Sequence, residues 1–306
     1  MPGFGLFPVW AVHIADGVLS WPWLAGGFVL AALLALVGAW RLRDEEVPRV
    51  AVLASAFFIA SLIHVRVGPS SVHLLLNGLV GVVLGRRAAL AIPVGLLLQA
   101  VLIGHGGFTT LGVNSCLMVL PALLAGLLFA GLCRLPGLRR PAFRTGLILI
   151  TAPLWALSLV YSAALLVSNL LQGRHLSAWN TLDAAWANRI TLHPAILAAI
   201  LAATVAAALL ERRLDHAPEF ALGLVVGELT VLATVLLNAV VLWFGSLEPE
   251  TGPSLALILC VLHLPIVAVE GVILGFTVSF LARVKPAMLG WETAAVARHR
   301  PVMEKE

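Results

Sequence analysis

The sequence predicts an all-α fold: a polytopic membrane protein built as a bundle of about nine transmembrane helices. Of its 306 residues, 61% are hydrophobic, and Asp, Glu, Lys and Arg together make up only 11%. A soluble globular protein has roughly a quarter of its residues charged, so this chain has too few charges to cover a surface in water. The composition therefore excludes a soluble enzyme, a nucleic-acid-binding protein and a disordered chain, and it makes the lipid bilayer the surrounding medium.

Nine apolar segments approach the length of about 20 residues that a helix needs to cross a bilayer. The third is the weakest, because Pro69, His73 and Asn77 interrupt it, and we expect only a short or irregular piece there. The segments are predicted near 23–40, 49–65, 68–85, 88–104, 112–133, 145–170, 194–210, 220–244 and 254–282.

The positive charges test this count independently. With the N-terminus outside, the loops that face the cytoplasm and the C-terminal tail hold all of the 19 Lys and Arg residues except Arg66, Arg174 and Arg189. Cytoplasmic loops of membrane proteins carry an excess of Lys and Arg. The pattern therefore predicts an N-out, C-in orientation in the plasma membrane.

His13, His64, His73 and His105 all fall at the outer ends of predicted helices or in outer loops. Polar groups at membrane depth are costly and by default mark function. Imidazole is the commonest side-chain ligand for late first-row transition metals. A single such histidine is more often an interfacial or hydrogen-bonded residue, but four on one face of the membrane favour a metal site.

A second polar pair lies in the last predicted span, where His263 and Glu270 are seven residues apart and share one helical face. They are either a buried packing pair or a proton relay. The sequence has no P-loop, no H-E-x-x-H zinc motif and no G-x-S-x-G elbow. We therefore expect no enzyme and no catalytic cofactor, and any uphill transport must draw on an ion gradient or on a separate ATPase.

Four stretches resemble the CbiM/NikM family, the substrate-binding membrane components of cobalt and nickel energy-coupling-factor transporters. They are VHIADGVLS (12–20), GPSSVHLLLNGLVGVVLG (68–85), HGGFTTLGVNSCLMV (105–119) and HLPIVAVEGVILGF (263–276). Each motif is moderately specific alone, and together they are specific in order and spacing. The resemblance covers roughly residues 12–134 and 219–287.

The resemblance implies a metal site formed by Val12, His13 and His73. The first residue would supply a free amine, the second its backbone nitrogen and imidazole, and the third a further imidazole. Such nitrogen donors close small chelate rings around a square plane, which suits Ni²⁺ and also admits Co²⁺ as the transported ion. Lower-ranked candidate ligands are His64, His105 and Asn114.

The chain departs from the family pattern in two ways. Eleven residues precede Val12, and we expect translation to start at Val12 or cleavage to occur after Ala11, because the amine must be free. Two predicted helices and their external loop have no counterpart in the seven-span pattern. The expected organisation is an extracytoplasmic segment with the metal motif (1–22), a first core part (23–134), an inserted helical pair (135–218), a second core part (219–287) and a cytoplasmic tail (288–306).

The resemblance thus implies the substrate-capturing component of an energy-coupling-factor ABC transporter for cobalt or nickel. Its expected partners are a membrane coupling protein and cytoplasmic ATPase subunits on separate chains, with a small accessory membrane subunit as a further candidate. No nucleic acid is expected as a partner. The alternative is a secondary transporter of a small cationic solute, driven by an ion gradient through His263 and Glu270.

Overall fold

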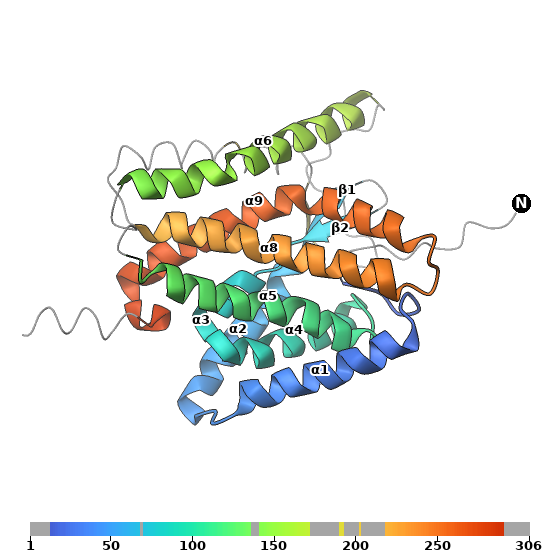
Figure 1. Cartoon of the computed structure of the whole chain (residues 1–306), viewed down its shortest axis with the longest axis horizontal. Helices are drawn as coiled ribbons and strands as arrows, with labels where there is room; N and C mark the ends of the chain where they lie inside the picture. Colours follow the sequence, from blue (N-terminus) through green and yellow to red (C-terminus); the bar gives the residue numbers. More distant parts are fainter. Residues whose placement is uncertain are drawn as a thin grey trace, which may run out of the picture.

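The computed structural model describes residues 13–67, 70–135, 141–171, 190–192, 202 and 218–290. These residues form a bundle in which the long helices lie alongside one another (Figure 1). The α-helices are α1 (Trp21–Ala39), α2 (Val47–Ala60), α3 (Asn77–Leu84), α4 (Ala88–Ile103), α5 (Leu111–Leu132), α6 (Pro141–Leu171), α8 (Pro218–Gly245) and α9 (Gly252–Val284). Three short 3-10 helices are η1 (Asp44–Glu46), η2 (Gly85–Arg87) and η5 (Pro286–Leu289).

Within the described residues, six helical stretches are long and apolar enough to cross a membrane. One of them, Asn77–Ile103, joins α3, η2 and α4. The chain is therefore a multi-pass membrane protein. The count of nine spans and the N-out, C-in orientation stay predictions, and the segment predicted near 194–210 lies almost entirely outside the described residues.

The helix predicted at 49–65 ends earlier than expected. Helix α2 has 14 residues and ends at Ala60, and at 1.5 Å per residue it is about 21 Å long, so the residues after it would have to complete a crossing of the roughly 30 Å hydrocarbon core. Strand β1 (Ile63–Val67) follows, with a β-branched residue at every second position, a pattern that favours a strand. The irregular piece expected at 68–85 is confirmed as a strand followed by the short helix α3.

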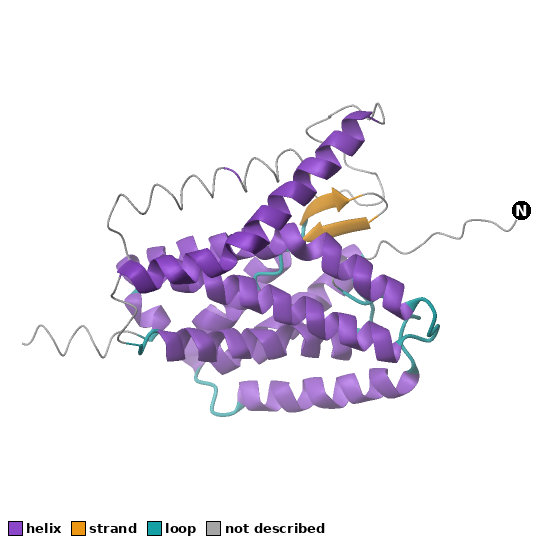
Figure 2. Cartoon of the chain, turned by 45° about the horizontal axis from the view of Figure 1, so that its top comes forward, coloured by secondary structure: helices purple, strands orange, loops and turns teal. Residues whose placement is uncertain are grey.

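The described residues are mostly helical, as predicted, but the all-α prediction missed a small sheet that lies beside the helices (Figure 2, orange). Its order is β2 (Ser70–His73), β1 and β3 (Ile190–Leu192). Strands β1 and β2 are antiparallel, with His64 opposite His73, and β3 pairs with β1 in parallel. Strand β1 therefore lies in the middle of the sheet, between β3 and the strand that ends at His73.

The centre of the bundle is the pair α8 and α9, whose backbones touch through glycines. A Cβ atom on Gly227 would lie 2.8 Å from the Cα atom of Gly271, and one on Gly223 would lie 2.7 Å from the Cα atom of Gly275. Small residues four apart allow helices in a membrane to approach closely. Helix α1, in contrast, buries only Gly38 and lies at the edge of the bundle (Figure 1).

Helix α6, from the predicted insertion, packs on α8 and α9 and makes polar contacts with both. The indole Nε1 of Trp155 donates a hydrogen bond of 2.6 Å to Glu228 on α8. The Ser158 hydroxyl donates one of 2.8 Å to the carbonyl of Leu264 on α9. These contacts attach α6 to the core, while the boundaries of the five predicted regions stay a prediction.

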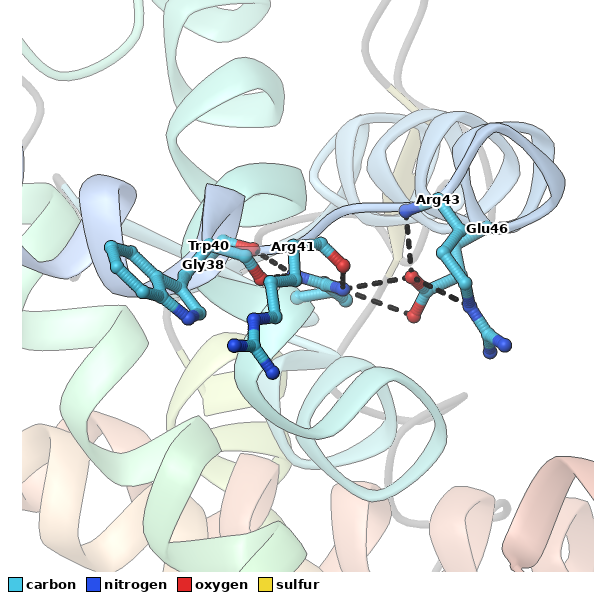
Figure 3. Close-up of polar contacts among 6 residues, drawn as sticks. Gly38, Trp40, Arg41, Arg43 and Glu46 are labelled. Atoms are coloured by element: carbon cyan, nitrogen blue, oxygen red, sulfur yellow. Dashed lines mark hydrogen bonds and ion pairs between the residues drawn. The ribbon is translucent and has the colours of Figure 1, made fainter.

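The C-terminal end of α1 is held by a buried arginine from η2. Arg87 is 4% exposed, and its guanidinium donates to the carbonyl oxygens of Gly38, Trp40 and Arg41 at 2.6–2.8 Å. It also donates to both carboxylate oxygens of Glu46. Figure 3 shows these carbonyls and the Glu46 carboxylate gathered around the guanidinium. The carbonyls that the end of a helix leaves without partners are thereby satisfied.

Candidate metal site

The candidate site begins in the segment between His13 and Ser20, which precedes α1 and is not helical. Its far end is attached to the connection between α8 and α9. The Ser20 N–H donates to the Gly245 carbonyl at 2.9 Å, and the Leu247 N–H donates to the Val18 carbonyl at 2.8 Å. These bonds fix the segment at the end of the bundle where α8 passes into α9.

The near end of the segment is held by Asn114, in the first turn of α5. The Ile14 N–H donates to Asn114 Oδ1, and Asn114 Nδ2 donates to the Ile14 carbonyl, both at 2.9 Å. The Thr110 hydroxyl donates to the same carbonyl at 2.7 Å. Asn114 is 2% exposed, so this pair of hydrogen bonds takes the place of water for a buried stretch of backbone next to His13.

Asp16 joins the same segment to the loop that carries His105. Its carboxylate accepts hydrogen bonds from the N–H groups of Phe108, Thr109 and Thr110 at 2.9–3.2 Å, and from the Thr109 hydroxyl. Burial alone would raise the pKa of the Asp16 carboxyl, but the hydrogen bonds from Thr109, Phe108 and Thr110 outweigh it and lower this pKa below its ordinary value. The carboxylate is therefore stable as an anion at this position.

Two glycines after His105 make the loop possible. Gly106 has a φ of +77°, a left-handed conformation that side chains disfavour. Any Cβ atom on Gly107 would overlap the Asp16 carboxylate. Gly106 therefore allows a tight turn, and Gly107, which has no side chain, leaves room for the Asp16 carboxylate.

These contacts bring three imidazoles together. His13, His73 and His105 are 3%, 1% and 6% exposed, and one potential ligand atom from each lies within 4.8 Å of the others. The ring centroids are 4.9–5.1 Å apart. A cluster of three buried imidazoles is a metal-ligand set suited to late first-row transition ions.

The ring of His73 has a defined tautomer. Its Nδ1 lies 2.8 Å from the carbonyl oxygen of Leu74 and must donate its proton there, which leaves a lone pair on Nε2. A histidine that gives its other ring N–H to a carbonyl is the usual arrangement of a metal ligand. Nε2 lies 3.1 Å from Nε2 of His105. Neighbouring nitrogen ligands, each about 2.0–2.1 Å from a metal, are about 3 Å apart, so this spacing fits a shared ion.

The structure therefore brings two of the principal predicted ligands, His13 and His73, close together, and the lower-ranked candidate His105 lies beside them. Val12 lies outside the described residues. The backbone of His64 lies opposite His73 in the sheet. Both polar atoms of the Asn114 side chain contact Ile14, so the structure gives Asn114 a supporting position next to the cluster.

The sequence interpretation missed the part played by Asp16. Its signal was present, because Asp16 lies within the quoted stretch VHIADGVLS. The number of hydrogen bonds that it accepts depends on a loop more than 90 residues away, as its separation of 92 residues from Phe108 shows.

Together, the membrane-spanning bundle and the buried histidine cluster define a class: multi-pass membrane proteins with a potential transition-metal site at one end. A family model, described as the cobalt uptake substrate-specific transmembrane region, CbiM, matches residues 13–210 and 145–288. The chain belongs to the CbiM family.

Individual relatives cover less of the chain. A Haemophilus influenzae protein named for metal transport is 48% identical over 118 residues, which are 39% of this chain and 57% of that protein. The cobalt transport protein CbiM of Geobacter sulfurreducens is 32% identical over 152 residues, which are 46% and 44% of the two chains. The chain thus spans about half the length of these curated relatives.

Two solved structures are also similar, a transition metal transporter and a truncated form of one. Their TM-scores are 0.46 and 0.44, each at 18% identity, and the matches cover 92% and 88% of this chain and 98% of theirs.

Proposed function

We propose that this chain captures Co²⁺ or Ni²⁺ and is the substrate-binding membrane component of an energy-coupling-factor ABC transporter. The observation that carries the proposal is the convergence of three buried imidazoles from three separate segments, the N-terminal segment, β2 and the loop before α5. Membership in a family described by cobalt uptake supports the same ion class. Imidazole binds both ions, so the donor atoms alone do not choose between them.

The proposed ligands are the imidazoles of His13 and His73, with His105 beside them and the Val12 nitrogen as a further donor. A protonated imidazole must lose a proton before it can bind a metal, so binding is expected to weaken as the solution becomes acidic. His64 and Asn114 stay lower-ranked candidates.

Alanine variants of His13 and His73 test the ligand assignment. We expect purified protein to retain about one Ni²⁺ or Co²⁺ per chain, and each variant to lose most of this metal while staying monodisperse in detergent. His263→Ala is the control, because His263 is equally buried but its Nδ1 donates to the Leu259 carbonyl within α9. Unchanged metal content in both test variants, measured by elemental analysis, would refute the assignment.

We further propose that ATP hydrolysis is supplied by separate chains, a membrane coupling protein and cytoplasmic ATPases, with a small accessory membrane subunit as a further candidate partner. The sequence has no P-loop of its own. A relative in Methanocorpusculum labreanum, 32% identical over 110 residues, is named as a fused cobalt transport protein, CbiMQ. Metal uptake by cells should therefore stop when the ATPase genes are deleted. Uptake that continues without them but collapses with an uncoupler would favour a secondary transporter.

The contacts of the last helix argue against the proton-relay alternative. Glu270 accepts hydrogen bonds from the backbone N–H groups of Leu75 and Leu76, and His263 donates to the carbonyl of Leu259. Each side chain is thus engaged with a different part of the backbone.

The proposed topology has nine spans with the N-terminus outside and the C-terminus inside. The distribution of Lys and Arg supports it. Single cysteines placed at Arg134 and at Gly17, labelled with a membrane-impermeant maleimide in intact cells, test it. Gly17 should be labelled and Arg134 should be protected.

A further inference from the structure

One buried carboxylate touches the metal-binding region without belonging to the histidine cluster. Glu270, in the middle of α9, is 4% exposed. Its Oε1 accepts hydrogen bonds from the N–H groups of Leu75 and Leu76, and its Oε2 lies 3.1 Å from the Leu76 nitrogen. These N–H groups follow His73 by two and three residues, and they belong to the turn between β2 and α3.

The backbone of this turn is strained. Leu76 has a φ of +50°, in the left-handed region that residues other than glycine and asparagine rarely adopt. Such a conformation costs about 1–3 kcal/mol and persists only where the surroundings enforce it. The Glu270 carboxylate accepts a hydrogen bond from the N–H group of Leu76 itself, so it is placed to hold this conformation.

The same turn determines the position of the His73 ring. His73 Nδ1 donates to the carbonyl of Leu74, the residue next to those held by Glu270. A change in the Leu75 and Leu76 backbone therefore moves the carbonyl that orients the ring, and with it the Nε2 atom that lies 3.1 Å from His105.

Glu270 is itself in a fixed position, because its neighbour Gly271 lies against α8. A Cβ atom on Gly271 would lie 2.8 Å from the Leu224 carbonyl oxygen. Helix α9 cannot slide along α8 without breaking this contact, so the carboxylate is presented to the turn by a rigid pair of helices.

We infer that Glu270 is the positioning residue for the metal ligand His73: it holds the strained turn at Leu75 and Leu76 so that the imidazole faces His13 and His105. This inference rests on the proposed function. Through Glu270 the geometry of the ligand cluster is joined to α9, and a displacement of α9 relative to α3 would change the affinity for the ion.

The test compares four full-length proteins in detergent micelles: wild type, His73→Ala, Glu270→Gln and Glu228→Gln. Glu228 is the matched control, a buried carboxylate on the adjacent helix that binds Trp155 rather than the turn. The probes are Ni²⁺ and Co²⁺, and the measurements are the dissociation constant and the visible absorption spectrum of bound Co²⁺. Thermal unfolding is recorded for every variant.

We expect Glu270→Gln to weaken metal binding by about 10- to 100-fold, the usual effect of removing a group that supports a ligand, and to shift the Co²⁺ bands. Glu228→Gln should keep the wild-type constant and spectrum. A residue that served stability alone would lower the unfolding temperature but leave the spectrum of the bound ion unchanged. If Glu270→Gln is not monodisperse, Glu270→Asp replaces it, since the shorter side chain also withdraws from the turn.

The outcomes separate the two proposals. Wild-type affinity and spectrum in Glu270→Gln, together with loss of binding in His73→Ala, would overturn the role of Glu270 and leave the metal site standing. Equal losses in Glu270→Gln and Glu228→Gln, with an unchanged spectrum, would also overturn it. Failure of the wild-type protein to bind either ion would instead overturn the proposed function.

Discussion

At the scale of single residues, the candidate site depends on side chains that bind backbone. Asn114 holds Ile14, and Asp16 holds the loop after His105. Neither needs to touch the ion, yet each fixes a segment that carries an imidazole. Groups of this kind commonly change metal affinity by about 10- to 100-fold when they are removed.

Asn114→Leu keeps the size of the side chain and removes both hydrogen bonds to Ile14. We expect Ni²⁺ affinity to fall by about tenfold or more, because the segment with His13 gains freedom. Isothermal titration of the purified protein measures the change. Thr277→Val, which removes a hydroxyl that donates to the Ile273 carbonyl of its own helix, should leave the affinity unchanged. Equal affinities in all three proteins would contradict the role given to Asn114.

Gly107→Ala places a methyl group where the Asp16 carboxylate lies. We expect the contact between the N-terminal segment and the His105 loop to open, with a lower unfolding temperature and weaker Ni²⁺ binding. Gly131→Ala is the control, since no atom lies within 4 Å of a Cβ at that position. A Gly107→Ala protein with wild-type binding and stability would show that Asp16 does not hold the loop closed.

The sequence predicts the residues of the site better than their contacts. His13 and His73 stand out, because imidazoles at outer helix ends in specific motifs point to metal binding. The hydrogen bonds of Glu270 could not be predicted, since their donors lie 194 and 195 residues away and only the folded chain brings them together. From the sequence, His263 is the expected polar partner of Glu270, because the two lie seven residues apart on one helical face.

At the scale of secondary-structure elements, the length of the apolar segments predicts the long helices correctly but overestimates the length of α2. Helices α1, α4, α5, α6, α8 and α9 were each predicted to within a few residues. Apolar length predicts a helix as far as residue 65, although the alternation of Ile63, Val65 and Val67 suits a strand. Hydropathy cannot distinguish a short helix from a strand here, because the strand depends on hydrogen bonds to β2, the partner strand that ends at His73.

The junction of α1, η1 and η2 gives a pH prediction. Hydrogen bonds from Arg87, with a smaller effect from the Arg43 N–H, lower the pKa of Glu46 from 4.5 to about 2. Because the pKa is depressed in the folded protein, the stabilisation is fully present above about pH 4.5 and is lost as the pH falls towards about 2.

The measurement is the unfolding temperature of wild type and Glu46→Gln in detergent from about pH 6 to about pH 2.5. We expect wild type to be more stable near pH 6 and the difference to shrink as the solution becomes acidic. A difference that stays constant over the whole range would show that the ionised Glu46–Arg87 pair does not contribute. Comparing the two proteins cancels the titration of the other carboxylates.

At the scale of the whole molecule, the chain gathers its proposed metal ligands from the N-terminal segment, β2 and the loop before α5, at one end of a helical membrane bundle. The Gly-mediated pair α8 and α9 forms the rigid centre, and both ends of the N-terminal segment are attached, one to that pair and one to α5. The bundle thus holds the buried imidazoles close to one another. Membership in the CbiM family supports Co²⁺ or Ni²⁺ as the proposed transported ion.

X-ray absorption spectroscopy of the Ni²⁺-loaded, full-length protein in detergent tests the central claim most directly. With one ion per chain, we predict nitrogen scatterers about 2 Å from the metal and outer-shell scattering from at least two imidazoles. Sulfur scatterers, or a spectrum without imidazole scattering, would contradict the account.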